Sequence, residues 1–142
     1  TVRDAFLTPE STKKLEEMLG KGLFTEVKTE NSLDRVTSAA TPRPIERVPA
    51  GAEFGFTLIV DIYDEADREL LRDLFGALAL VEDGTLGGGG SRGHGQIEFG
   101  GLEVKWRPLA YYLEGKGEKP IAAASGKRVR DIAAGFNAQE WV

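Results

Sequence analysis

Alternation of apolar and polar residues marks residues 54–63 as the clearest strand in the chain. Apolar side chains occupy every second position from Phe54 to Ile62, which places them on one face of an extended strand. The spacing becomes helical over residues 64–82, with Asp64 as the expected N-cap. The apolar stripe of this helix would consist of Leu70, Leu71, Leu74, Phe75, Leu78 and Val81.

The N-terminal residues predict a shorter strand and a shorter helix. Val2–Leu7 is typical of a strand that ends at Thr8-Pro9. Residues 11–20 predict a helix with Ser11 as its N-cap and Gly20 as its stop. The expected apolar stripe of this helix is Leu15, Met18 and Leu19.

Residues 24–53 contain few side chains that could anchor a core. Residues 24–33 and 43–48 have extended patterns, and prolines at 42, 44 and 49 interrupt the segment. We therefore predict a long hairpin or arm that projects from the body.

Residues 97–106 predict a further strand or strand pair, bent at Gly100-Gly101. Trp106 ends this segment, and its position favours a core role over stacking on a base. Beyond Pro108 we expect a loop, with a terminal helix over Lys127–Gln139.

The order strand, helix, glycine-rich loop, strand corresponds to one half of a ferredoxin-like (RRM-like) α+β fold. Val2–Leu7 is the candidate last strand of the other half, and a small α+β sandwich of another topology is the alternative. We predict one domain over residues 1–107, including the arm 24–53, and a C-terminal extension over residues 108–142.

Composition narrows the class of protein. At 142 residues and 41% hydrophobic, the chain can bury a core. The absence of cysteine excludes disulfides and cysteine nucleophiles and fits a reducing cytoplasm. No apolar run approaches the ~20 residues of a membrane span, and no secretory signal opens the chain. Because a strand pattern follows Thr1 directly, we expect upstream residues to be missing.

The net charge of −5 disfavours nucleic acid as a partner, but the excess of negative charge is concentrated in one segment. Residues 64–83 hold seven acidic and two basic side chains, so the rest of the chain is neutral overall. The carboxylates are scattered around a predicted helix, which indicates a solvated face and not a metal site.

Residues 84–95 form a loop with seven glycines in twelve positions. Such a backbone can adopt positive φ and turn successive N–H groups toward an anion. Arg92 would add a bidentate phosphate donor, and Ser91 and His94 would add hydrogen bonds. The loop lacks the Gly-Lys-Ser/Thr ending of a Walker A motif, and it leaves a helix and enters a strand, unlike a dinucleotide-binding loop. A flexible linker is the alternative.

The order Leu86-Gly87-Gly88, Ser91-Arg92-Gly93-His94-Gly95, then residues 96–99, resembles the glycine-rich loop of the RAMP superfamily of CRISPR proteins. Residues 2–7, 25–37 and 40–48 further resemble one branch of it, the backbone subunit of the type III-A (Csm) interference complex. The resemblance implies a ferredoxin-like fold and RNA contacts from Gly87, Gly88, Ser91, Arg92, Gly93, His94 and Gly95.

In that family the segment corresponding to residues 31–48 is a thumb-like hairpin that displaces a base pair of the guide–target duplex. The resemblance implies that Leu33, Val36, Pro44 and Ile45 form the wedge, because apolar side chains can replace a stacking partner. It also implies that Arg35, Arg43 and Arg47 hold phosphates. The alternative for these arginines is solvated surface, paired with Glu46 or Asp34.

The resemblance implies target-RNA cleavage by the intact subunit, with a divalent metal (Mg) and an acidic residue that lies upstream of this chain. We therefore assign no catalytic residue and no metal ligand here. Glu26 and Glu30 flank Lys28 near the base of the arm, where an exposed charged strand is the simpler interpretation. His94 is the only histidine, which excludes a two-histidine ribonuclease mechanism within the chain.

The implied partners are guide RNA (crRNA), target RNA, further copies of the subunit and other subunits of the CRISPR complex, with no membrane. Two alternatives differ in class. One is a guide-RNA processing endoribonuclease of the same superfamily, and the other is a non-catalytic structural subunit without RNA contact.

Overall fold

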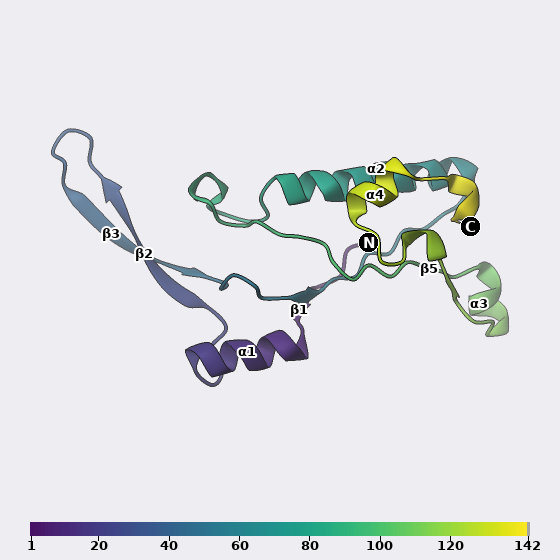
Figure 1. Ribbon diagram of the computed structural model, residues 1–142, viewed down its shortest axis with the longest axis horizontal. Helices are drawn as coiled ribbons and strands as arrows, with labels where there is room; N and C mark the ends of the chain where they lie inside the picture. The colour runs from purple at the N-terminus through teal and green to yellow at the C-terminus, as the bar shows by residue number, and fades with distance from the viewer. Residues whose placement is uncertain (142) are drawn as a thin grey trace. The chain divides into compact units, whose positions relative to one another are not determined.

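A computed structural model describes residues 1–141 and shows a mixed α and β chain (Figure 1). The strands within this range form three antiparallel sheets of two strands each. The mixed content is as predicted, whereas the ferredoxin-like arrangement stays a prediction because each sheet is only a strand pair. No helix in residues 1–141 is long and apolar enough to cross a membrane. The chain divides into two compact units, Thr1–Val60 and a second that begins at Asp61.

The elements of the first unit are β1 (Phe6–Leu7), α1 (Pro9–Leu19), β2 (Glu26–Leu33), β3 (Ala40–Arg47) and β4 (Phe54–Gly55). Those of the second are α2 (Glu65–Asp83), η1 (Gly90–Arg92), β5 (Lys105–Trp106), α3 (Leu109–Glu114), β6 (Lys119–Pro120), η2 (Ala122–Ala124), α4 (Val129–Ala134) and η3 (Ala138–Glu140). The predicted domain boundary after residue 107 stays a prediction.

β1 and β4 belong to a longer ribbon that a bulge interrupts. The N–H of Arg3 donates to the Thr57 carbonyl at 3.1 Å, while Phe6 pairs with Gly55. Two residues, 4 and 5, therefore lie opposite Phe56 alone, which is the arrangement of a β-bulge. The strands predicted over residues 2–7 and 54–63 are therefore broken into short ladders. The second is also too long, because the ribbon's last hydrogen bonds join Thr1 and Ile59.

The N-cap of α1 lies three residues earlier than predicted. The Thr8 side chain accepts the Ser11 N–H at 3.2 Å, and Pro9 occupies the first turn, where its missing N–H has no helical partner to lose. The prediction of Ser11 as N-cap is therefore wrong. Ser11 is buried, and its Oγ accepts the Glu53 N–H at 2.8 Å. Met18, placed in the apolar stripe, is exposed.

α2 confirms the helix predicted over residues 64–82, extended by one residue. Asp64 accepts the N–H of Asp67, and the Asp67 carboxylate accepts the N–H of Asp64, which forms a capping box. Phe75 of α2 enters a core with residues from the C-terminal segment. That core consists of Phe75, Ala124, Val129, Ile132 and Trp141. Leu70, predicted in the apolar stripe, is exposed.

Residues 97–106 half-bury alternate side chains, and the alternation shifts at Gly100-Gly101. Gly101 has φ +61°, the bend expected there. Phe99, Leu102 and Val104 pack against the core of the second unit. Only Lys105–Trp106 is hydrogen-bonded as a strand, to β6, so the strand predicted over residues 97–106 is wrong for most of its length.

The expectation of a loop after Pro108 is wrong, because this segment contains α3, β6 and α4 and supplies most of the second unit's core. The helix predicted over 127–139 is shortened to α4. It ends at Ala134, before Gly135, and the Asn137 side chain accepts the Gln139 N–H to start the next turn.

Candidate RNA interface

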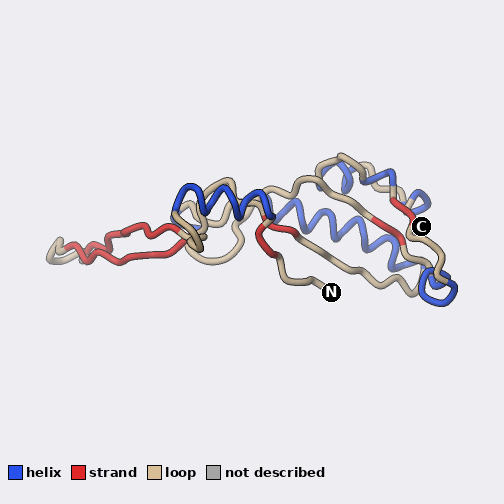
Figure 2. Tube along the Cα trace, turned by 90° about the horizontal axis from the view of Figure 1, so that it is seen from below, coloured by secondary structure: helices blue, strands red, loops and turns tan. Residues whose placement is uncertain are grey.

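β2 and β3 form a regular antiparallel hairpin, with paired strands visible in Figure 2. The pairs run from Glu26–Arg47 to Leu33–Ala40. Because side chains alternate along a strand, paired residues share a face. One face carries Glu26, Lys28, Glu30, Ser32, Thr41, Arg43, Ile45 and Arg47. The other carries Val27, Thr29, Asn31, Leu33, Ala40, Pro42, Pro44 and Glu46.

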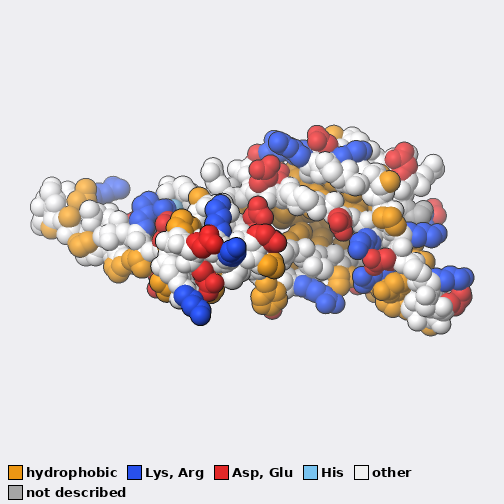
Figure 3. Space-filling model, turned by 60° about the horizontal axis from the view of Figure 1, so that its bottom comes forward, with side chains coloured by type: hydrophobic (Ala, Val, Ile, Leu, Met, Phe, Trp, Pro, Cys, Tyr) orange, Lys and Arg blue, Asp and Glu red, His pale blue; other side chains and the backbone are white. Residues whose placement is uncertain are grey.

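The register separates the predicted wedge residues. Leu33 and Pro44 share the less charged face, whereas Ile45 lies on the opposite face with the arginines. Val36 lies in the turn and is 93% exposed. Figure 3 shows apolar side chains on the surface of the hairpin, at the left of the view. The four residues therefore do not lie on one face of the hairpin, one face of which is mostly apolar, and their role as a wedge stays a prediction.

The predicted phosphate-binding arginines of the hairpin differ in their surroundings. Arg47 is half-buried, and its Nε lies 2.5 Å from Oε1 of Glu26. Glu46 is on the other face, and the Asp34 carboxylate is engaged in the turn, so neither is positioned as the partner of Arg47. Arg35 and Arg43 are exposed. These two are the hairpin arginines most accessible to a ligand.

Asp34 organises the turn of the hairpin. Its Oδ1 accepts the Thr37 N–H at 2.8 Å and the Val36 N–H at 2.9 Å. Ser38 adopts φ +59°, and the Asp34 N–H donates to the Ala39 carbonyl at 2.9 Å. The hydrogen bond from Thr37, then that from Val36, lowers the pKa of the Asp34 carboxyl. The exposed tip is therefore held by a charged Asx turn.

The turn should loosen in acid. Since the pKa of Asp34 is lower in the folded than in the unfolded chain, its carboxylate stabilises the turn above the unfolded pKa of about 3.9. That contribution is lost as the pH falls through the folded pKa. Hydrogen exchange of the Val36 and Thr37 amides, corrected for its intrinsic pH dependence, should accelerate below about pH 4. In Asp34→Ala the exchange should be fast at every pH. Unchanged protection in that variant would contradict the role of Asp34.

The glycine-rich loop, residues 84–95, is an internally bonded structure. The N–H of Leu86 donates to the Gly95 carbonyl at 2.8 Å, which joins the two ends of the loop. Glu82 accepts the Phe99 N–H at 2.7 Å and so links the end of α2 to the segment after the loop. A flexible linker would lack such bonds, so they argue against that alternative.

Several backbone donors of the loop are used within it. The N–H groups of Arg92 and His94 donate to the Gly89 carbonyl, and that of Gly93 donates to Gly90. Gly89 and Gly93, on either side of η1, have left-handed φ values of 76° and 78°. The anion-binding surface predicted here must therefore rely more on side chains than on these three N–H groups.

The predicted contact residues of the loop divide by exposure. Gly87, Gly88, Ser91, Arg92 and Gly93 are exposed. His94 and Gly95 are half-buried, and a Cβ on Gly89 would lie 2.8 Å from Nδ1 of His94. The His94 ring therefore packs against the loop backbone, which favours a role in loop shape over surface contact.

Sequence reasoning missed the C-terminal residues at the base of this loop. Arg130 forms an ion pair with Asp83, immediately before the loop, and Arg128 lies 3.9 Å from Glu98, shortly after it. The signal for them was the basic run Lys127-Arg128-Val129-Arg130. This run does not match an RNA-binding motif, and only the tertiary structure brings it close to the loop.

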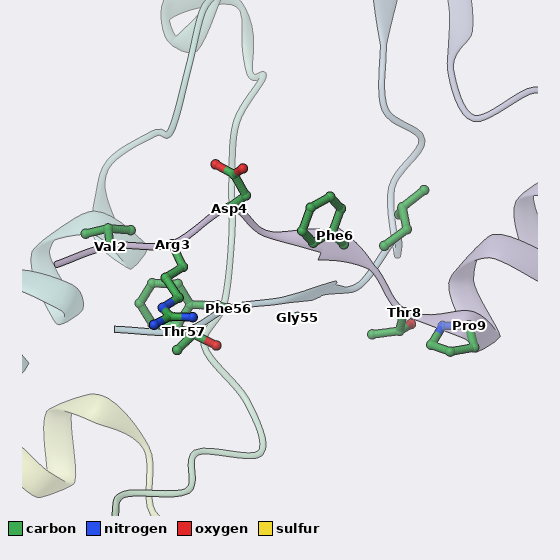
Figure 4. Close-up of a pocket in the computed structure, with 10 residues that line it drawn as sticks. Val2, Arg3, Asp4, Phe6, Thr8, Pro9, Gly55, Phe56 and Thr57 are labelled. Carbon is green, nitrogen blue, oxygen red and sulfur yellow. The ribbon is translucent and has the colours of Figure 1, made fainter. Parts of the chain in front are cut away.

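The first unit also has an open groove of about 810 Å³ along its ribbon. Figure 4 shows that its walls come from the segment Val2–Pro9 and from residues 55–57. The bulge opposite Phe56 lies within this groove. The groove adds no residue to the hairpin or loop sites.

Metal ions in proteins are commonly held by clusters of side chains such as His, Asp and Glu. Among residues 1–141, no three side chains of the His, Asp and Glu types come together in an arrangement that could hold an ion. We therefore derive no metal-assisted step from these residues.

Comparison with protein families gives a match across both candidate contact regions. The profile of the RAMP superfamily matches residues 2–98, which include the hairpin and the glycine-rich loop.

Curated proteins named "CRISPR system Cms endoribonuclease Csm3" are similar to this chain. That of Methanothermobacter thermautotrophicus is 46% identical over 120 residues, 84% of this chain and 49% of the relative. That of Streptococcus thermophilus is 42% identical over 105 residues, covering 72% and 46%. That of Mycobacterium tuberculosis is 38% identical over 104 residues, covering 63% and 44%. The chain thus spans about half the length of these relatives.

Proposed function

Since this chain belongs to the RAMP superfamily, we propose that it is the RNA-gripping part of a backbone subunit of a type III-A CRISPR interference complex. The observation that carries the proposal is the continuous superfamily match over the hairpin and the glycine-rich loop. The names of the relatives, all Csm3 proteins of a CRISPR system, support this assignment. The ferredoxin-like fold belongs to the same proposal.

The partners in this proposal are a guide RNA, a target RNA paired with it, copies of the subunit and other subunits of the complex. Guide and target backbones are polyanions, and exposed arginines on a hairpin and a loop supply the matching charge. The net charge of −5 does not oppose this, because much of it lies on α2 and its ends.

Within the hairpin, Leu33 and the tip residue Val36 are the proposed base-displacing side chains. Leu33 is exposed on the mostly apolar face and Val36 at the turn, so each could enter a base stack without first leaving a core. Arg35 and Arg43 are the proposed phosphate contacts of the hairpin, and Ser91 and Arg92 those of the loop.

Endoribonuclease activity is proposed only for the whole subunit, with Mg²⁺ as its expected metal. The relatives are named endoribonucleases over about twice the length of this chain. Because that name does not specify which RNA is cleaved, guide-RNA processing is the second candidate function. Metal-independent cleavage of a repeat RNA by this chain would favour that alternative.

RNA binding by the hairpin can be tested by salt titration. Fluorescence anisotropy of a labelled single-stranded RNA would compare wild type with the double variant Arg35→Gln/Arg43→Gln. Each lost phosphate contact should reduce the slope of log K against log salt by about 0.7, and hence by about 1.4 for the pair. Affinity near 0.1 M salt should fall roughly tenfold.

Lys13→Gln is the matched control, because Lys13 is an exposed, ion-paired cation on α1, outside the proposed interface. It should bind RNA like wild type. Equal slopes for the double variant and wild type would remove the hairpin arginines from the interface. A wild-type chain without RNA affinity would refute the proposed function for this chain.

A further inference from the structure

The C-terminal segment 127–130 is a short basic stretch outside the superfamily match, which ends at residue 98. Three of its four residues are cationic in a chain of net charge −5. Val129 is fully buried in the core of the second unit and anchors the segment. The side chains on either side of it remain in solvent, with Arg128 78% and Arg130 55% exposed.

Two ion pairs place this segment at the base of the glycine-rich loop. Arg130 contacts Asp83, the last residue of α2, and Arg128 contacts Glu98, three residues past the end of the loop. The hydrogen bond between Leu86 and Gly95 closes the loop between these points. Both guanidinium groups therefore lie beside the two chain segments that flank the loop.

From this arrangement we propose that Lys127, Arg128 and Arg130 form a second phosphate-binding segment that holds RNA together with the glycine-rich loop. The inference rests on the proposed function, and it adds a ligand-binding role to residues that the family match does not cover. Guanidinium groups bind phosphate through paired N–H donors, which suits two arginines flanking a fixed residue.

Asp83 and Glu98 act in this proposal as internal competitors of RNA. Exposed ion pairs are weak, because water and salt screen them, so the closely spaced phosphates of a polyanionic RNA can replace the carboxylates. In the free protein the same pairs keep the arginines near the loop. Removal of the carboxylates would leave the guanidinium groups available to RNA without changing their number.

The competing explanation is that the ion pairs only clamp the loop. It predicts the opposite change in RNA affinity when the carboxylates are removed. If the pairs only held the loop in shape, loss of either side would weaken RNA binding alike. If the arginines bind phosphate, loss of the arginines weakens binding while loss of the carboxylates strengthens it. Separate substitution of the arginines and of the carboxylates therefore distinguishes the two explanations.

The experiment measures anisotropy of a labelled oligouridylate of about 20 nucleotides, over a range of NaCl concentrations, with the full chain. For Arg128→Gln/Arg130→Gln we expect roughly tenfold weaker binding and a slope smaller by about 1.4. For Asp83→Asn/Glu98→Gln we expect severalfold tighter binding. Lys127→Gln alone, a single exposed substitution, should reduce the slope by about 0.7 even if the double arginine variant fails to fold.

Lys116→Gln is the matched control, because Lys116 is an exposed cation in an ion pair with Glu114 on the same unit. It should leave affinity unchanged. The proposal is overturned if the folded arginine variant and Lys127→Gln bind like wild type, or if the carboxylate variant weakens binding as much as the arginine variant. Absence of RNA binding by wild type would instead refute the proposed function itself.

Discussion

Gly95→Ala is expected to disrupt the glycine-rich loop and to lower RNA affinity by about tenfold or more. The strained backbone that alanine would need here costs a free energy of that order. Gly95 has φ +79°, a conformation that costs an L-residue about 1–2 kcal/mol. Its added Cβ would also lie 2.3 Å from the Leu86 carbonyl oxygen. That atom belongs to the backbone, so relief requires Leu86 and Gly95 to separate and break the bond that closes the loop.

Two neighbouring glycines provide comparisons. A Cβ on Gly90 would also lie 2.3 Å from an atom, but that atom is Oγ1 of the Thr85 side chain and not backbone, and Gly90 has no left-handed φ. Gly90→Ala should therefore have a smaller effect. Gly100 has open space around the Cβ position and no left-handed φ, so Gly100→Ala should change neither stability nor RNA binding.

RNA anisotropy and thermal unfolding would be measured together for the three glycine variants. The expected order of affinity loss is Gly95→Ala, then Gly90→Ala, then Gly100→Ala. Wild-type affinity in Gly95→Ala would show that the closed shape of the loop is not needed for RNA contact.

Phe75→Ala should destabilise the second unit by about 3–5 kcal/mol, the usual cost of removing a buried aromatic ring. Phe75 is 5% exposed, and its ring centroid lies 5.1 Å from that of Trp141. It joins α2 to α4 in the core, and Figure 1 shows these two helices side by side. Because small proteins are stable by only about 5–15 kcal/mol, this single change should leave the unit close to unfolding.

Leu80→Ala on the same helix is the matched control. Leu80 is 71% exposed, and alanine is at least as favourable in a helix as leucine, so stability should change by less than about 0.5 kcal/mol. Urea unfolding followed by circular dichroism would measure both variants. Similar midpoints for Phe75→Ala and Leu80→Ala would mean that the core is not centred on Phe75.

Local patterns in the sequence determined the elements whose stabilising contacts lie close along the chain. Asp64 caps α2 through residues three positions away, so the helix start could be predicted. The shift in alternation at Gly100-Gly101 likewise follows from a local bend. The hairpin could be predicted because an extended pattern without core residues leaves few other structures.

Tertiary structure alone decided which residues meet across long separations. Ser11 has the chemistry of an N-cap, but burial and the distant N–H of Glu53 give it another role, while Thr8 caps α1. The bulge opposite Phe56 depends on how two distant segments are aligned, which alternation within one segment does not encode.

The same distinction applies to the candidate interface. The sequence by itself determined the composition of the glycine-rich loop, its place between a helix and an alternating segment, and its resemblance to an RNA-binding family. Only the fold placed Ile45 on the face opposite Leu33, and only the fold brought Arg128 and Arg130 to the base of the loop. The reason is physical: hairpin register and core packing are set by contacts between residues far apart in the chain, whereas caps, turns and alternation depend on near neighbours.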